Sequence, residues 1–170
     1  MEGTALPVQG TSARSDAAAR ALVLEPAAYD DPVSQRLVAA LQQEFVERYG
    51  GPDETPVRPE EFAPPLGTFL VGRLDGEPVA CGGWRRVDAE LGEIKRMYVA
   101  REHRRRGLSR VVLAALEGSA RAAGLRRLRL ESGDRQPEAV ALYTSSGWTP
   151  IPPFGLYASE EGNVCLGKEL

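Results

Sequence analysis

The sequence predicts a single α/β domain, α+β in the wider sense, in which a mixed β-sheet carries helices on its faces. Three observations predict this fold class. The length of 170 residues suits one domain. Apolar residues recur with helical spacing in some segments and with strand-like alternation in others. Three strand-like segments in succession precede a strand–helix–strand order, and such a combination needs both antiparallel and parallel pairing.

The composition is that of an ordinary globular chain. Hydrophobic residues make up 42% and charged residues 26%, which excludes wholesale disorder, a collagen-like repeat and a coiled coil. No apolar run approaches the roughly 20 residues that span a bilayer. Two cysteines are too few for a disulfide scaffold. We therefore expect a cytoplasmic protein without membrane contact, with Cys81 and Cys165 as thiols.

The first part of the chain carries one short strand and one long helix. Residues 1–19 are small and polar, and we expect a flexible tail there rather than a secretory signal, followed by one domain over residues 20–170. Residues 21–26 predict a strand that ends at a proline. A helix is predicted over residues 31–49, because an Asp-Pro start precedes apolar residues at every fourth position. Residues 52–65, rich in proline and acids, predict an irregular loop with one helical turn.

Three strands follow, and the period then changes. Residues 67–74, 75–84 and 92–99 have strand character, and Asp75-Gly76 is a hairpin signal between the first two. After Gly107 the apolar residues take helical spacing. A helix is therefore predicted from Leu108 to a C-cap at Gly124.

The last part of the chain repeats the alternation of strand and helix. Residues 125–131 predict a strand, and residues 137–146 predict a helix that begins at a proline and ends before a glycine. A strand is predicted to begin at residues 148–151. The alternating residues 163–170 close the chain as a strand.

Charge is distributed unevenly along the chain. Residues 85–135 hold 14 basic and seven acidic side chains, although the whole protein has a net charge of −3. Residues 25–61 hold nine acids and three arginines. The basic middle favours a polyanionic ligand and the acidic segments a cationic one. Solvated surface faces are the alternative explanation.

The stretch from Glu93 to Arg110 carries the clearest chemical signal. A strand runs into an arginine-rich turn with a glycine, and a helix follows. A helix N-terminus presents free N–H groups that bind phosphate. The glycine allows close approach of the backbone. These features predict a pyrophosphate site, and a solvated arginine cluster stays open as the alternative.

Two motifs resemble those of a known family. Residues 104–109, Arg-Arg-Arg-Gly-Leu-Ser, resemble the Arg/Gln-x-x-Gly-x-Gly/Ala signature of the GCN5-related N-acetyltransferase (GNAT) superfamily, with Ser109 at the last position. Residues 136–148 resemble the family's Asn-x-x-Ala-x-x-Leu-Tyr-x-x-x-Gly-Phe pattern, with Gln136 and Trp148 at its ends. Residues 48–56 and 136–155 further resemble a bacterial subgroup of uncertain substrate.

The resemblance covers residues 21–170 and implies a fold and a cosubstrate. The fold would be a single GNAT-like domain, with a twisted mixed sheet of six to seven strands, about four helices and the order β-α-α-β-β-β-α-β-α-β-β. The cosubstrate would be acetyl-CoA, with no metal. Its contacts would come from the strand, the turn and the last helix: Met97, Tyr98, Val99, Arg104, Arg105, Arg106, Gly107, Leu108, Ser109, Arg110, Gln136 and Tyr143.

The resemblance also implies a reaction and residues to perform it. An acetyl group would pass to the primary amine of a small molecule by direct attack in a ternary complex. Tyr143 matches the tyrosine that protonates the leaving thiolate. Glu93 matches a strand glutamate that acts as general base in some members, and Glu131 and Glu44 are rival bases.

Aromatic and acidic residues are the candidates for contact with the acceptor. We expect Trp84, Glu44, Phe154 and Tyr157 to contact it.

A peptide or protein acceptor is the alternative within the enzyme class. A non-catalytic acyl-CoA-binding or nucleic-acid-binding module is the alternative from another class. Nucleic acid is disfavoured by the sequence pI of about 5.4 and by the absence of aromatics within the basic run. Homodimerisation through the terminal strand stays open.

Overall fold

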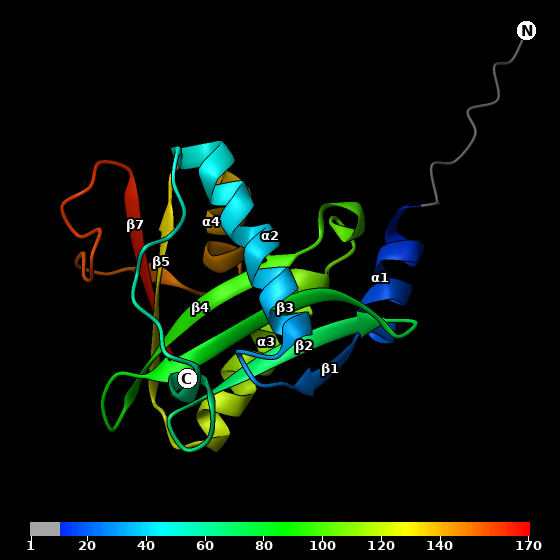
Figure 1. The fold of residues 1–170 in the computed structure, drawn as a ribbon, viewed down its shortest axis with the longest axis horizontal. Helices are drawn as coiled ribbons and strands as arrows, with labels where there is room; N and C mark the ends of the chain where they lie inside the picture. Colours follow the sequence, from blue (N-terminus) through cyan, green and yellow to red (C-terminus); the bar gives the residue numbers. More distant parts are fainter. Residues whose placement is uncertain (1–10) are drawn as a thin grey trace, which may run out of the picture.

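The computed structural model describes residues 11–170, and its centre is one seven-stranded sheet in the order β1-β2-β3-β4-β5-β7-β6 (Figure 1). The strands are β1 (Val23–Pro26), β2 (Gly67–Leu74), β3 (Glu77–Arg86), β4 (Leu91–Val99), β5 (Arg127–Gly133), β6 (Thr149–Pro150) and β7 (Asn163–Glu169). Only the pair β4–β5 is parallel, and the other neighbours are antiparallel. The predicted mixed sheet is confirmed.

Helices cover both faces of this sheet. Helix α2 (Pro32–Tyr49) crosses one face, and α3 (Leu108–Ala122) lies on the opposite face (Figure 1). Helices α1 (Thr11–Ala21) and α4 (Pro137–Ser145) complete the set in the described chain. Two separate hydrophobic clusters result. One joins α3 to β3, β4 and β5, and the other places α2 against β2 and β3.

The boundaries of α2 follow from local chemistry. The Asp31 side chain accepts a hydrogen bond from the Val33 N–H at 2.8 Å, so it caps the first turn. At the other end Gly50 adopts φ 84°, and its N–H donates to the Val46 carbonyl. Such a left-handed residue ends a helix with little strain only when it is glycine. The cap and stop signals predicted from the sequence are both confirmed.

One segment differs from the sequence expectation. Helix α1 occupies Thr11–Ala21 and overlaps the end of the expected flexible tail, while residues 1–10 lie outside the described part. This segment is alanine-rich, which favours a helix, and Ala18 packs against the α3 cluster.

The single helical turn predicted within residues 52–65 is confirmed as the 3₁₀ turn η1 (Pro59–Phe62). It stands where the family resemblance implies a second helix between β1 and β2, and the prolines around it prevent a longer helix.

The strands β4 and β5 pair over only part of their length. Their Cα partners run from Leu91–Arg127 to Glu93–Arg129 and then stop. Beyond this point the pairing of β4 with β3 shifts in register opposite residues 81–83. The β4 segment at this shift contains Arg96, which has φ 59°. The extra residue is a β-bulge, which bends a strand away from its neighbour. The sheet is therefore open between β4 and β5 on the side where both strands end.

No helix within residues 11–170 combines the length and the apolar character that a membrane crossing requires. Nor do the same residues contain a group of three or more histidine, cysteine or acidic side chains arranged to hold a metal ion.

Replacing Glu117 with alanine should lower the free energy of unfolding by about 2–3 kcal/mol. Glu117 accepts from Trp148 Nε1 at 2.9 Å and from Lys168 Nζ at 2.8 Å, so it joins α3 to the end of the chain. Its loss leaves both donors without this partner. Urea unfolding measures the change. Glu90→Ala is the control, because Glu90 pairs with Arg126 at an exposed position, and it should cost under about 0.5 kcal/mol. Equal losses in the two variants would contradict the prediction.

Candidate functional site

A cavity of about 460 Å³ opens at the separated ends of β4 and β5. It is bounded by β4, the turn after it, the start of α3, and α4, with α2 along one side. Its lining includes many residues singled out from the sequence: Met97, Tyr98, Val99, Arg104, Arg105, Leu108, Ser109, Gln136, Tyr143 and Glu44. The other residues singled out from the sequence are not among its lining residues: Arg106, Gly107, Arg110, Glu93, Trp84, Phe154 and Tyr157.

The turn between β4 and α3 has a backbone suited to an anion. Arg105 has φ 60° and Gly107 has φ 74°, so two left-handed residues lie one residue apart in this turn. Left-handed residues in a turn are typical of nests, in which successive N–H groups converge on an anion, and the N-terminus of the 15-residue helix α3 adds its own free N–H groups. Leu108 and Ser109 bring this helix start to the cavity wall.

Most arginine side chains around the turn are engaged with protein groups. Arg104 Nε donates to the Val99 carbonyl at 2.8 Å, and its guanidinium also bonds Glu44. Arg101 Nε meets the same Glu44 carboxylate at 3.1 Å. Arg110 reaches Ser145 Oγ at 2.7 Å, which joins α3 to the end of α4. The exception is Arg105, which lines the cavity and whose side chain has no partner within residues 11–170, so the backbone amides and this guanidinium are the groups suited to an anion.

Glu44 lies beneath the arginine turn and lines the cavity. The sequence predicts that it contacts the acceptor or acts as a base, and the residue is 5% exposed. Its ion pairs with Arg101 and Arg104, both through Oε1, fix that turn to α2. Glu44 therefore positions the turn.

Tyr143 lies inside the cavity, as the motif predicts. Its side chain is 8% exposed, and the hydroxyl donates to Met97 Sδ at 3.7 Å. Thioether sulfur is a weak acceptor, so the proton is loosely held. Burial raises the pKa of the Tyr143 phenol well above its ordinary value. The phenol therefore remains protonated throughout the physiological range.

Glu93 lies apart from this cavity. It faces the α2 side of the sheet and is buried at 4% exposure. Three cations surround its carboxylate: Arg129 at 3.0 Å, Arg85 at 3.5 Å and Lys95 at 3.7 Å. Glu93 and Lys95 lie two residues apart on β4 and so share a strand face, on which they form this ion pair.

The other residues expected to contact substrate divide into two groups. Trp84 is a correction, because it is 2% exposed in the α3 cluster and its Nε1 donates to Ser119 Oγ at 2.7 Å. Phe154 and Tyr157 lie on the loop between β6 and β7. The Arg129 guanidinium stacks 3.9 Å from the Phe154 ring centroid. Tyr157 Oη accepts from the Glu54 N–H at 2.7 Å, so this loop is tied to the loop before η1.

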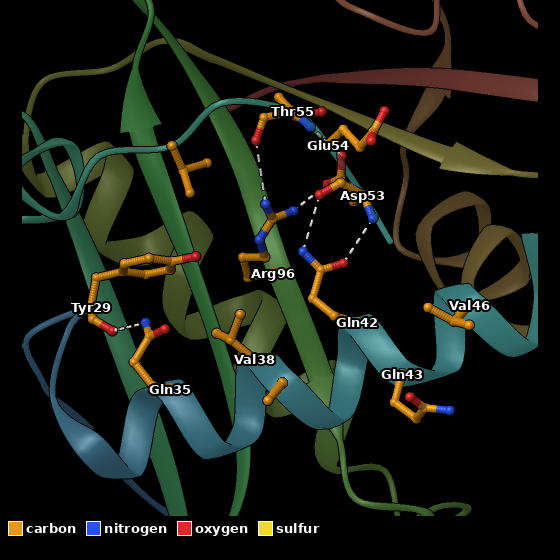
Figure 2. Close-up of a pocket in the computed structure, with 12 residues that line it drawn as sticks. Tyr29, Gln35, Val38, Gln42, Gln43, Val46, Asp53, Glu54, Thr55 and Arg96 are labelled. Atoms are coloured by element: carbon orange, nitrogen blue, oxygen red, sulfur yellow. Dashed lines mark hydrogen bonds and ion pairs between the residues drawn. The ribbon is translucent and has the colours of Figure 1, made fainter. Parts of the chain in front are cut away.

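A second cavity of about 550 Å³ lies between α2 and residues 53–57. Figure 2 shows Arg96 reaching from β4 toward Asp53 and Thr55, while the Gln42 amide is clamped against the Asp53 backbone by two hydrogen bonds. Burial would raise the pKa of the Asp53 carboxyl, but Lys95 and Arg96 outweigh it and lower the pKa to about 2. The sequence analysis missed Gln42 and Arg96, because neither lies in a motif.

Comparison with known proteins identifies the family. Residues 35–148 match the acetyltransferase (GNAT) family. The chain belongs to the GNAT family of acetyltransferases. An IAA acetyltransferase from Azospirillum brasilense is 38% identical over 113 residues, which is 65% of this chain and 73% of that protein. The GNAT chain is therefore an acyltransferase, and acetyl-CoA is its cosubstrate.

Two solved structures share this GNAT fold. A Klebsiella pneumoniae protein assigned as an acyl-CoA N-acyltransferase has a TM-score of 0.74 and 32% identity, covering 88% of this chain and 97% of its own. A GNAT family acetyltransferase from Elizabethkingia anophelis, with acetyl-CoA bound, has a TM-score of 0.66 and 16% identity over 88% of this chain and 99% of its own.

The residues present fit acetyl-CoA. The nest around Arg105 and Gly107 suits a diphosphate, because its donors are backbone amides and the helix dipole favours negative charge. Beyond Glu93, the β4 edge that faces β5 pairs with no strand in the described chain, so its backbone groups can bind the amides of an extended arm. The cavity between these features joins them to Tyr143.

Replacing Asp53 with asparagine should lower the free energy of unfolding by about 2 kcal/mol at neutral pH. The folded-state pKa of Asp53 lies below its ordinary value, so the stabilisation is present above pH 3.8 and is lost as the pH falls toward about 2. Urea unfolding should show a smaller difference in unfolding free energy between the wild-type protein and Asp53→Asn at pH 3 than at pH 7. Glu54→Gln, at the adjacent exposed position, is the control and should leave the stability unchanged. A pH-independent difference would contradict this account.

Replacing Gly107 with alanine should weaken acetyl-CoA binding at least about tenfold, because strain at a positive φ shifts the nest. Gly124→Ala is the matched control. Gly124 has φ 85°, no neighbouring atom lies within 4 Å of the position that an alanine Cβ would take, and the residue follows the C-terminal end of α3, at the opposite end of the helix from the nest. Calorimetry should show a loss of affinity only for Gly107→Ala, with both variants losing about 1 kcal/mol of stability. Equal acetyl-CoA affinities would count against the nest.

Proposed function

We propose that this GNAT protein transfers the acetyl group of acetyl-CoA to the primary amine of a small molecule, by direct attack in a complex that holds both substrates. The observation that carries the proposal is the place of Tyr143. A buried phenol with a raised pKa lines the cavity that also contains the nest residues Arg105 and Ser109. A neutral phenol at this position is suited to donate a proton.

The state of the cysteines supports direct attack. The sequence contains two cysteines, and both are buried. Cys81 Sγ donates to the Arg96 carbonyl at 3.4 Å, and burial raises the pKa of its thiol far above the ordinary range. The thiolate is the nucleophilic form of cysteine. An acyl-cysteine route therefore has no activated thiol at Cys81, and the structure does not bring it to His103, which lies beside Arg106.

Each part of the cavity has a role in this proposal. Bound acetyl-CoA supplies an acyl group on a good leaving group. The amides of residues 104–109 hold its diphosphate, and the free edge of β4 from Met97 to Val99 orients its arm and the acyl carbonyl. Tyr143 Oη holds the proton that the departing sulfur needs.

A small acceptor is supported by the loops on the α2 side. The bond from the Glu54 N–H to Tyr157 Oη ties residues 53–57 to the β6–β7 loop. Phe154, stacked on Arg129, adds an aromatic wall to the same loop. Loops held together in this way restrict the approach of a folded protein chain more than that of a small amine. The relative named IAA acetyltransferase also favours a small molecule.

The test of the acceptor class is a panel of acceptors with release of the CoA thiol as the readout. An alkyl diamine, an arylalkylamine, an amino-acid amide and a short peptide with a free N-terminus cover the alternatives. We expect turnover of at least one small amine with a higher kcat/KM than the peptide. A preference for the peptide would overturn the small-molecule assignment, and initial-rate lines characteristic of a ping-pong scheme would overturn direct attack.

Replacing Tyr143 with phenylalanine should lower kcat by about 100-fold, because general acid catalysis typically contributes a factor of this order. The KM for acetyl-CoA should change little, since the ring and its contact with Trp148 remain. Tyr49→Phe is the control, because Tyr49 is a half-exposed tyrosine on α2 outside the cavity lining. An unchanged kcat in Tyr143→Phe would remove the acid role.

A further inference from the structure

The second cavity, between α2 and residues 53–57, has no part in the proposed reaction. Its volume is about 550 Å³, against about 460 Å³ for the cavity at the separated ends of β4 and β5, and the two share no lining residue. Gln42 and Val46 of α2 line the second cavity, whereas Leu41 and Glu44 of the same helix line the first. An occupant of the second cavity therefore leaves the first one free.

The walls of the second cavity are held together by side chains that connect them. The Gln42 amide, on α2, donates to the Asp53 carbonyl at 3.1 Å and accepts from the Asp53 N–H at 2.8 Å. Arg96, on β4, bonds the Asp53 carboxylate and, at 3.5 Å, the Thr55 carbonyl (Figure 2). The helix, the loop and the strand are thus tied to one another. A cavity with fixed walls binds a ligand at a low ordering cost.

The Arg96 guanidinium keeps one donor that the protein does not use. Its side chain is only 3% exposed. Nη1 and Nη2 donate to Asp53 and Thr55, but Nε is buried and has no hydrogen-bond partner within residues 11–170. Leaving a buried donor without a partner is costly. Such a group in a native structure calls for an explanation, and a bound molecule at the cavity that Arg96 lines supplies one.

Two hydroxyl groups of the same lining add to this unused hydrogen-bonding capacity. Thr55 Oγ1 is also buried without a hydrogen-bond partner in the described chain. The Tyr29 hydroxyl points toward the Arg96 guanidinium (Figure 2), and the Tyr29 ring is fixed by stacking on Phe62 at a centroid distance of 4.8 Å. The cavity therefore offers an unused N–H donor and two hydroxyl groups from three different segments.

The charges around the cavity favour a neutral ligand. The ionised lining residues are Asp53, Glu54 and Arg96, and Lys95 pairs with Asp53 at 3.6 Å. An anion placed beside Arg96 would be repelled by the two carboxylates, and a cation placed beside Asp53 would be repelled by Arg96 and Lys95. A neutral group avoids both penalties.

The unused groups and the apolar lining define the rest of the ligand. Arg96 Nε can only donate, so the ligand must supply an acceptor, whereas the Thr55 hydroxyl can also accept. An amide satisfies both, because it has a carbonyl oxygen and an N–H group. The apolar part of the lining consists of Val38, Ala39, Val46 and Val57. These side chains suit a short alkyl chain.

We propose that the second cavity binds a small neutral molecule with a secondary amide and a short alkyl chain, at a site separate from that of acetyl-CoA. The amide oxygen accepts from Arg96 Nε, and the amide N–H donates to Thr55 Oγ1. The alkyl chain packs on the apolar lining of α2. Binding is non-covalent, and it does not depend on which acceptor the acetyl transfer uses.

The test titrates N-butylacetamide into the full-length, nitrogen-15-labelled protein and follows the Arg96 Nε–H resonance by NMR. We expect a saturable shift with a Kd of about 1 mM, because a ligand of this size makes few contacts. Saturating acetyl-CoA should leave this Kd unchanged within about twofold, since the two sites are separate. Butylammonium and butanoate have a similar chain but carry a charge, and each should bind at least about tenfold more weakly.

Two variants test the cavity itself. Ala39 is an exposed lining residue of α2, so Ala39→Phe places a ring in the cavity and should weaken N-butylacetamide binding at least about tenfold. Arg36→Phe is the matched control at an exposed α2 position outside both linings, and it should keep the wild-type Kd. Thr55→Val removes the hydroxyl with little change in shape and should weaken binding at least about threefold. Thermal unfolding should confirm that each variant is folded.

The outcomes that contradict the proposal are distinct. A wild-type Arg96 Nε–H resonance that does not shift would overturn the site and indicate a cavity filled by water. Tighter binding of butanoate or butylammonium would overturn the neutral amide as the ligand class. Displacement of N-butylacetamide by acetyl-CoA would show that the sites are not separate. Equal weakening in Ala39→Phe and Arg36→Phe would place the binding outside the second cavity.

Discussion

The separation of two parallel strands is the constraint on which the rest of this structure depends. β4 and β5 share backbone pairing only as far as Glu93 and Arg129. Past that point β4 still pairs with β3 and β5 still pairs with β7, but β4 and β5 no longer pair with each other. The sheet is therefore continuous where these two strands begin and open where they end. Backbone polar groups at such an opening need partners. An extended ligand with amide groups can supply them at the cavity that opens between these strands.

The bulge that opens the sheet is itself fixed from outside the sheet. A residue other than glycine at φ 59° is strained unless its surroundings hold it. Arg96 is held by Asp53 and by the Thr55 carbonyl, and Asp53 is held by Lys95 and by the Gln42 amide. The loop before η1 therefore supports the opening and does not merely cover it. Mobility of this loop would affect the β4 backbone and, through it, the cavity at the separated ends of β4 and β5.

Sequence patterns predicted most of the elements and the left-handed turn before α3, because both depend on local chemistry. Caps, glycines at positive φ and the turn at residues 104–109 are properties of a few adjacent residues. The predictions that failed concern which face of the sheet a side chain occupies. Trp84 was placed toward a substrate although β3 turns it into the α3 cluster. Simple alternation would put Lys95 and Arg96 on opposite faces, but the bulge lets both reach Asp53. No local signal in the sequence reveals a bulge of this kind.

Acyl transfer to an amine needs a proton for the departing sulfur, and the strand separation lies beside a group suited to hold that proton. Tyr143, on α4, is kept protonated by burial in an apolar setting. Its side chain lines the cavity at the separated ends of β4 and β5. In a continuous sheet, backbone pairing would occupy the β4 edge, and an extended arm could not bind there beside Tyr143. The same strand separation thus gives the proposed acyl-donor site and the proposed proton donor a common cavity.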